Sequence, residues 1–310
     1  MKKIKIGNFY LLKDRANFIL VEITQTESFE EKIRWEMIIT PSQIFLFLST
    51  LLTTTAMGAI MQGFSPLSKD IVKGFIFSLP LIFILASHEL GHILAMRKYG
   101  IRSSFPYFIP APNIIGTFGA IMILREKINE SSKILKIGAW GPIAGFLAAI
   151  PVSIIGLNLS SIVEASAQQE GMIKLGSPIL FSVMEKIIFK VPDGSDLLLH
   201  PIAFAGWIGF FVTAINLIPV GQTDGGHIVF SITPHFHKTI SLITSLSLVI
   251  FGLIFWYGWI IWGILTLILG IRSIPYLPHQ DIGKNEKIIA IISLLIFILS
   301  FTIAPIEIKY

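Results

Sequence analysis

The chain has 310 residues, of which 53% are hydrophobic and only 14% are charged, whereas about 25% of residues are charged in an ordinary soluble domain. This composition excludes an ordinary soluble domain and predicts an all-α, polytopic membrane protein. The net charge of +5 is explained by basic cytoplasmic loops, so we expect no nucleic-acid partner. Because cysteine is absent, disulfides and thiolate metal sites are excluded, and any metal ligand must be His, Asp or Glu.

The first 36 residues differ in composition from everything that follows them. Residues 1–36 mix basic, acidic and apolar positions and lack the apolar core of a signal peptide. We expect them to form a small, strand-rich cytoplasmic segment. The transmembrane domain is then expected to occupy residues 37–310, with its functional core at 74–228.

Long uncharged runs locate the membrane-spanning helices, because about 20 apolar residues cross a hydrocarbon core. The run at 239–271 is too long for one ordinary crossing. It is interrupted by the sequence FWYGWI, whose aromatic residues suit a membrane interface and whose glycine suits a turn. We therefore predict a helical hairpin there. Together the runs predict about seven helices, at 42–62, 74–97, 135–157, 201–219, 239–256, 259–272 and 287–305.

The distribution of Lys and Arg predicts the orientation of these helices. With a cytoplasmic N-terminus, the inner segments are 1–36, 97–136, 221–238 and 272–287, and they hold 18 of the 24 basic residues. The excess of basic residues on one side is typical of the cytoplasmic face of a membrane protein. We expect a multi-pass protein with its N-terminus in the cytoplasm.

The second predicted helix contains the sequence ILASHELGHILAM, at residues 84–96. His88 and His92 are four residues apart, so they lie on one helix face about 6 Å apart along the axis. This is the pattern H-E-x-x-H, in which two histidines bind a metal and the glutamate acts as general base. Ionisable residues at membrane depth mark functional sites. We therefore expect His88 and His92 to be metal ligands and Glu89 to be the general base.

The segment that follows this helix is apolar but rich in helix-breaking residues. The sequence PYFIPAPNIIGTFGAIMIL carries three prolines and two glycines over 106–119. We predict a short re-entrant or extended segment near the active site, whose free edge pairs with an unwound substrate as an added strand. Gly116 and Gly119 are candidate substrate-binding residues. The alternative is a loop that serves packing alone.

A third metal ligand is expected at the end of the fourth predicted helix. The sequence NLIPVGQTDGGHI, at 216–228, breaks regular helix with a proline and three glycines. Asp224 is placed at this break and is the candidate third ligand, with His227 as a competing ligand. Asn216 either hydrogen-bonds the substrate backbone or stabilises the break.

Two further histidines lie in the segment PHFHK, at residues 234–238. His235 and His237 are two residues apart and therefore do not share a helix face. We expect both at the surface of a cytoplasmic turn and assign them no chemistry.

The pair of motifs HELGH and NLIPVGQTDGG resembles the site-2 protease family of intramembrane zinc metalloproteases. The resemblance covers roughly residues 74–306 and includes the sequence GAWGPIAGF. Within the family, the chain is similar to the branch found in cyanobacteria, other bacteria and plastids. It implies one zinc ion per chain, held by His88, His92 and Asp224. Thr223 departs from the pattern, which has Leu before the acid. The segment 158–200 is shorter than the usual minimum of about 50 residues for a domain, so no inserted PDZ domain is expected.

The resemblance also implies the activity and the partners. It implies hydrolysis of peptide bonds within or next to the transmembrane helix of a membrane-protein substrate in a lipid bilayer, in a bacterial inner membrane. Two alternatives remain. A transporter or channel would also bury ionisable residues, but it does not explain two histidines at ligand spacing. A non-catalytic relative that binds membrane helices is the second, and the intact Glu89 argues against it.

Overall fold

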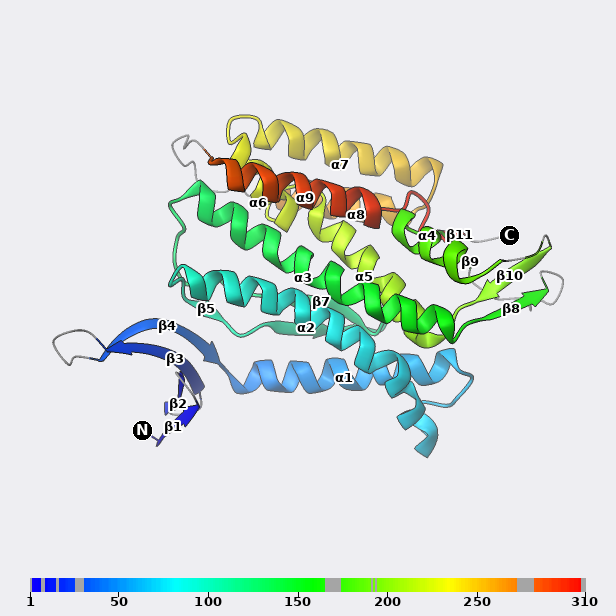
Figure 1. Ribbon diagram of the computed structural model, residues 1–310, viewed down its shortest axis with the longest axis horizontal. Coiled ribbons are helices and arrows are strands. Elements are labelled where there is room, and N and C mark those ends of the chain that lie inside the picture. Colours follow the sequence, from blue (N-terminus) through cyan, green and yellow to red (C-terminus); the bar gives the residue numbers. More distant parts are fainter. Residues whose placement is uncertain are drawn as a thin grey trace.

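A computed structural model describes residues 2–6, 9–14, 17–25, 31–164, 174–190, 192, 194–271 and 282–307. The described chain is mostly helical, and its long helices lie roughly along the longest axis of the molecule, with the N-terminal strands at one end (Figure 1). The long helices are α1 (Pro41–Met61), α2 (Phe75–Lys98), α3 (Ser131–Asn158), α5 (Pro201–Leu217), α7 (His237–Ile254), α8 (Gly258–Ile271) and α9 (Lys284–Ser300). The described residues also form two short helices, α4 (Ile179–Ile188) and α6 (Asp224–Ile232), and the 3-10 helix η1 (Lys69–Gly74).

Each of the seven predicted helices coincides with one of the long helices. Within the described residues, four helical stretches are long and apolar enough to cross a membrane, namely Pro41–Met61, Lys69–Lys98, Ser131–Asn158 and His237–Ile254. Two shorter apolar helices occupy Pro201–Leu217 and Gly258–Ile268. The polytopic character is therefore supported, while the number of seven crossings stays a prediction.

The predicted hairpin at 239–271 is present as two helices that pack against each other. Helix α7 ends at Ile254 and α8 begins at Gly258. The turn is lined by indole rings, since Trp256 and Trp259 meet edge to face with centroids 5.4 Å apart. Aromatic side chains at such a turn suit the boundary between hydrocarbon and water.

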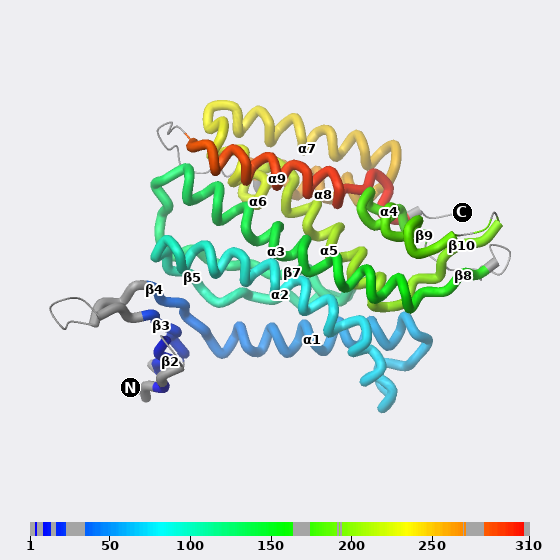
Figure 2. Tube along the Cα trace, in the orientation of Figure 1, coloured from blue at the N-terminus to red at the C-terminus, as the bar shows by residue number. Residues whose placement is uncertain are grey.

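The N-terminal segment is strand-rich, as predicted, so the all-α expectation holds only for the helical part of the chain. Strands β1 (Lys2–Ile6), β2 (Phe9–Asp14), β3 (Asn17–Gln25) and β4 (Glu31–Ile39) form an antiparallel sheet. A fifth strand, β5 (Ser103–Ser104), joins β4 in parallel. Because β5 follows α2 almost directly, the sheet is attached to the end of that helix, as the tube in Figure 2 also shows.

Three contacts hold this sheet against the end of α2. The guanidinium of Arg97 donates two hydrogen bonds of 2.9 Å to the nearly buried carboxylate of Glu22. The same guanidinium lies over the ring of Phe9, 4.5 Å from its centroid. The buried indole of Trp35 donates to the carbonyl of Ile101 at 2.8 Å. A two-pronged ion pair of this kind fixes the orientation of its partners as well as their distance.

The proline-rich segment after α2 forms a β-hairpin, which agrees with the predicted extended segment. Strand β6 (Tyr107–Pro110) pairs antiparallel with β7 (Thr117–Ile121), and both strands contact α1. At the tip, the Asn113 side chain accepts hydrogen bonds from the backbone N–H groups of Ile115 and Gly116. Asparagine commonly closes turns in this way.

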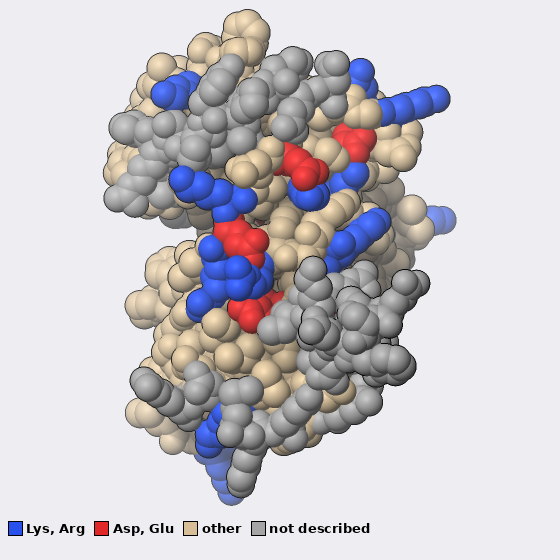
Figure 3. All heavy atoms as spheres, turned by 90° about the vertical axis from the view of Figure 1, so that its left-hand side faces the viewer, with Lys and Arg blue, Asp and Glu red and all other residues tan. Residues whose placement is uncertain are grey.

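The segment between α3 and α5, which the predicted topology places on the outer side, has strands in two small sheets and the short helix α4 among its described residues. Strand β8 (Ser161–Glu164) pairs with β10 (Ser195–Leu198), and β9 (Lys174–Leu175) pairs with β11 (Ile306–Glu307). Charged residues gather at the opposite end of the molecule, the end that faces the viewer in Figure 3. There Arg102 pairs with Glu36 and Glu126, and Lys136 pairs with Glu286.

We predict that Arg97→Met loosens the N-terminal sheet. The substitution keeps an unbranched side chain but leaves the carboxylate of Glu22 without its guanidinium, and because Arg97 is itself 35% exposed the cost is about 1–3 kcal/mol. The expected result is faster amide hydrogen exchange in β2, β3 and β4. Lys98→Met, which removes the exposed neighbouring charge, is the control. Equal exchange in both variants would contradict a structural role for the ion pair.

Candidate metal centre

Three of the predicted site residues meet at one point between α2 and α6. His88 and His92 project from the same face of α2, and Asp224 is the first residue of α6. The two Nε2 atoms are 3.2 Å apart. One carboxylate oxygen of Asp224, Oδ2, lies 3.3 Å from Nε2 of His88 and 3.4 Å from Nε2 of His92. Within the described residues, these three side chains form a group whose ligand atoms all lie within 4.8 Å of one another.

The distances in this group suit a tetrahedral metal ion. Ligand atoms about 2.0–2.1 Å from a tetrahedral ion lie about 3.3–3.4 Å from one another, close to the three separations observed. The side chains of His88, His92 and Asp224 are only 6%, 11% and 16% exposed. Three donor atoms are therefore preset around one point, away from bulk solvent.

A backbone carbonyl from α3 fixes the orientation of the second histidine. Nδ1 of His92 lies 2.8 Å from the carbonyl oxygen of Ile137. Because a carbonyl oxygen only accepts hydrogen bonds, Nδ1 carries the proton, and the lone pair of the neutral ring is on Nε2. Nε2 lies 3.2 Å from Nε2 of His88 and 3.4 Å from Oδ2 of Asp224, so its lone pair is available to a cation that all three side chains would share.

Glycines on α3 leave the space that His88, His92 and Asp224 occupy. A Cβ at Gly141 would collide with the ring of His92, and a Cβ at Gly145 would lie 3.1 Å from His88. At Gly138 a Cβ would lie 3.0 Å from the carbonyl oxygen of Asp224. The sequence GPIAGF, which is typical of close helix packing, therefore lies directly behind the candidate metal centre.

The local sequence before Asp224 explains why a new helix starts at this residue. Thr223 is the N-cap of α6, and its hydroxyl accepts a hydrogen bond of 3.0 Å from the backbone N–H of Gly226. The same hydroxyl donates to the carbonyl of Ile218 at 2.6 Å. Threonine suits an N-cap, whereas leucine does not. The departure of Thr223 from the resembled pattern thus supplies a cap next to Asp224.

Glu89 and Asn216 lie beside the group without belonging to it. Glu89 is 8% exposed and is within electrostatic reach of His88, His92 and Asp224. The amide nitrogen Nδ2 of Asn216, near the end of α5, lies 3.4 Å from Nε2 of His88. Glu89 thus places a carboxylate, and Asn216 an amide, next to the three donor atoms.

The two candidate glycines of the hairpin differ in their surroundings. Gly116 has a φ of +83°, its carbonyl accepts from the Thr53 hydroxyl at 2.7 Å, and a Cβ would crowd the α1 backbone at Thr54. Gly119 has a φ of +90° and nothing within 4 Å of its Cβ position. Its neighbour Phe118 is 72% exposed. Gly116 thus attaches the hairpin to α1, while Gly119 lies at an open position.

Among the remaining histidines, His235 is exposed as expected, whereas His237 differs from the expectation. His227 is not in the group of three, and within the described part of the chain its Nδ1 is buried without a hydrogen-bond partner. The expectation of a surface position for His237 was wrong, because this residue is only 3% exposed. The burial of His237 is indicated in the sequence by its spacing from Ser241, because residues four apart share one face of an apolar helix.

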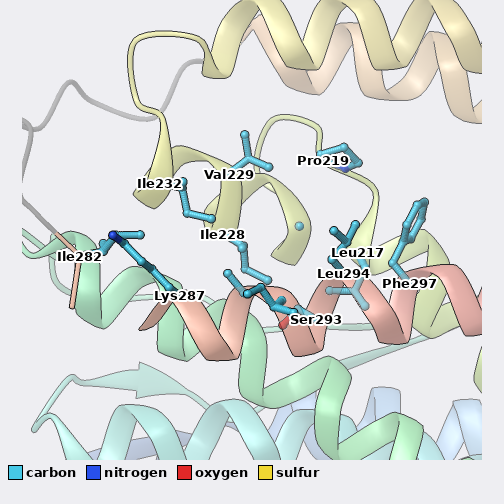
Figure 4. Close-up of a pocket in the computed structure, with 13 residues that line it drawn as sticks. Leu217, Pro219, Ile228, Val229, Ile232, Ile282, Lys287, Ser293, Leu294 and Phe297 are labelled. Atoms are coloured by element: carbon cyan, nitrogen blue, oxygen red, sulfur yellow. The ribbon is translucent and has the colours of Figure 1, made fainter. Parts of the chain in front are cut away.

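An apolar groove lies on the side of α6 that faces α9 (Figure 4). Its volume is about 520 Å³, and none of the three grouped residues lines it. The lining comes from the end of α5, from α6 and from α9, and includes Leu217, Ile228, Ile232, Leu294 and Phe297, with Lys287 at one end. A lining of this kind suits hydrocarbon. Helix α6 therefore carries Asp224 at its first residue and an apolar surface along its side.

Comparison with known proteins places these features in one family. The profile of Peptidase family M50 matches residues 76–256. The chain is 30% identical over 242 residues to "Probable zinc metalloprotease EGY2, chloroplastic" from Arabidopsis thaliana, covering 75% of this chain and 41% of that protein. It is 31% identical over 229 residues to "Probable zinc metalloprotease EGY1, chloroplastic" from Oryza sativa subsp. japonica, covering 70% of this chain and 38% of that protein. The chain thus spans about two fifths of the length of these relatives. No solved structure matches it significantly.

We predict that Gly141→Ala disrupts metal binding. The new methyl group collides with the His92 ring, and displacing a ligand costs about 10-fold or more in metal affinity. Metal content of the purified protein, measured by elemental analysis, is expected to fall well below that of the wild type. Leu147→Ala, at an exposed position on the same helix α3, is the control. Full metal content in Gly141→Ala would show that α3 does not set the ligand position.

Proposed function

The chain belongs to peptidase family M50, and from this premise we propose that it is an intramembrane zinc metalloendopeptidase. The observation that carries the proposal is the convergence of His88, His92 and Asp224 on one point beside a nearly buried Glu89. The three side chains would hold one zinc ion, and their donor set of two imidazoles and one carboxylate suits zinc. When bound there, zinc supplies Lewis-acid chemistry that polarises a peptide carbonyl and lowers the pKa of a water molecule.

The residues of the chain supply the remaining chemistry. The carboxylate of Glu89 accepts a proton from the attacking water and passes it to the leaving amine nitrogen, which requires a base near the reacting atoms. Its electrostatic reach to His88, His92 and Asp224 supports this role. The amide of Asn216 is close enough to donate to a substrate carbonyl or to keep the His88 ring in place.

We propose that the substrate is the transmembrane segment of another membrane protein. His88 and His92 lie in the membrane-spanning candidate Lys69–Lys98, so the reacting peptide bond must reach hydrocarbon depth or its boundary. A helical substrate hides its backbone in internal hydrogen bonds and must unwind before cleavage. Hydrolysis within or next to such a segment is the function that these positions support best, with residues 74–228 as its core.

The β6–β7 hairpin is the proposed docking edge for the unwound substrate. Strand β7 contacts α2, the helix that carries the two histidines. The open surroundings of Gly119 support access to this strand, and an extended peptide can add to a free strand edge. Gly116 supports this arrangement indirectly, because it attaches the hairpin to α1.

Two other functions fit less of the evidence. A transporter or channel with a buried proton or metal site would use ionisable residues at this depth, but it gives no role to the preset tetrahedral spacing of three donors. A non-catalytic member of the family would bind membrane helices without needing Glu89. Zinc content and cleavage by the wild type separate both alternatives from the proposed protease.

We predict that Glu89→Gln keeps zinc and abolishes proteolysis. The three ligands are unchanged, while the proton acceptor is lost, which costs at least about 100-fold in rate. The measurement pairs zinc analysis with cleavage of a membrane-protein substrate in proteoliposomes. Substantial cleavage by Glu89→Gln would reject the assigned base. Absence of cleavage by the wild type for every substrate tested would favour the non-catalytic alternative, and absence of zinc would favour transport.

We propose that the N-terminus and the charged end of the molecule face the cytoplasm. The unequal division of Lys and Arg along the chain supports this orientation. The residue pairs at the charged end, which include Arg102, Lys136 and Glu286, all fall in the segments assigned to the inner side. The two relatives named above are chloroplastic, so the proposal of a bacterial inner membrane rests on the resemblance to the branch shared by bacteria and plastids.

We predict opposite labelling of two single-cysteine variants. Because the natural chain has no cysteine, an impermeant thiol reagent reports one introduced site at a time. Lys190→Cys, at an exposed position after α4, should react from the outside, and Lys127→Cys, at an exposed position before α3, only after permeabilisation. The reverse pattern would invert the proposed topology.

A further inference from the structure

Gly221 lies between α5 and α6, three residues before Asp224, and is held from two sides. Its backbone N–H donates to the hydroxyl of Ser241 at 3.0 Å. Its carbonyl oxygen lies 3.2 Å from Nε2 of His237. Both side chains come from α7, one helical turn apart, and each is 3% exposed. Helix α7 thus provides hydrogen-bond partners for both the backbone N–H and the backbone carbonyl of the buried Gly221.

The held residue has a backbone conformation that depends on these contacts. Gly221 has a φ of +51°, in the left-handed region that glycine adopts most readily. A buried backbone group without a hydrogen-bond partner is costly, so a loop in which both groups are satisfied from α7 has one preferred position. The ring of His237 is itself fixed by Phe230, which it meets edge to face with centroids 5.5 Å apart.

Close contacts within residues 220–226 couple the position of Gly221 to that of Asp224. The backbone N–H of Thr223 donates to the carbonyl of Val220 at 3.1 Å, and the Thr223 hydroxyl oxygen lies 2.9 Å from the same carbonyl oxygen. The carbonyl of Gly221 lies so close to Gly226, in the first turn of α6, that a Cβ there would collide with it. A shift of Gly221 therefore shifts the start of α6, and Asp224 is the residue at that start.

We propose that His237 and Ser241 are positioning residues that set the place of the Asp224 carboxylate through Gly221. This inference rests on the proposed function, in which Asp224 is a zinc ligand. The two residues do not touch the metal site; they act on the loop from the side opposite His88 and His92. Residues around metal ligands that fix their geometry contribute about 10–100-fold to metal affinity.

The proposal predicts weaker zinc binding when either contact is removed. His237→Ala and Ser241→Ala should each raise the zinc dissociation constant about 10-fold, measured by competition with a chelator. His237→Gln keeps an N–H donor near the same place and should recover most of the loss. Thr239→Ala, at an exposed position on the same turn of α7, is the matched control and should bind zinc like the wild type.

A double-mutant cycle separates positioning from general damage. In an Asp224→Ala background, where the two remaining histidines bind zinc weakly, His237→Ala should cause no further loss of affinity, because its effect passes through the missing carboxylate. Equal loss in both backgrounds would overturn the proposal, and so would unchanged affinity in both single variants. Unfolding temperatures of the zinc-free variants identify a loss of fold, in which case Ser241→Ala, the smaller change, decides.

The proposed function and this inference fail in different ways. If the wild type does not bind zinc, or if Asp224→Ala binds it as tightly as the wild type, the assignment of the metal ligands is wrong. If Asp224→Ala weakens binding while the His237 and Ser241 variants do not, the ligands stand and the positioning role is rejected.

Discussion

The convergence of two imidazoles and one carboxylate inside an apolar helical bundle is the constraint on which the rest of the structure depends. Polar and charged groups are costly to bury unless they are paired. Here the donor atoms of His88, His92 and Asp224 lie 3.2–3.4 Å apart, and a shared cation, such as the zinc ion of the proposed function, would stabilise all three. The neighbouring elements are arranged so that these donors stay close while the surrounding surface remains apolar.

Two elements that contribute no ligand control the geometry of the group. Helix α3 provides a carbonyl that orients His92 and, at Gly141, the space for its ring. Helix α7 holds the loop before Asp224 at Gly221. The three side chains on α2 and α6 are thus fixed by two further helices, so the geometry of the candidate metal centre depends on the helical bundle as well as on the two sequence motifs.

Local spacing made part of this structure predictable. The seven long helices follow from uncharged runs, and the pairing of His88 with His92 follows from helix geometry, because both signals lie within one element. Asp224 was predicted as a third ligand from the proline and glycines that end the preceding helix, and this role stays a prediction. Helix α6 was missed because it has only nine residues, and the burial of His237 was missed because it depends on Phe230 and Gly221, which belong to other elements. The ion pair between Glu22 and Arg97 joins residues 75 positions apart, beyond the reach of any periodic pattern.

The position of the β6–β7 hairpin shows how such long-range contacts combine. On one side, Gly116 is held by the hydroxyl of Thr53 on α1. On the other, the chain leaving β7 pairs with the strand after α2, where the N–H of Ser104 donates to the carbonyl of Ile123 at 3.0 Å and the N–H of Arg125 donates to the carbonyl of Arg102 at 3.1 Å. The same strand pairs with β4 of the N-terminal sheet. The sheet and the hairpin therefore share one backbone segment that begins where the histidine-bearing helix ends, so the N-terminal sheet contributes to fixing the hairpin relative to the candidate metal centre.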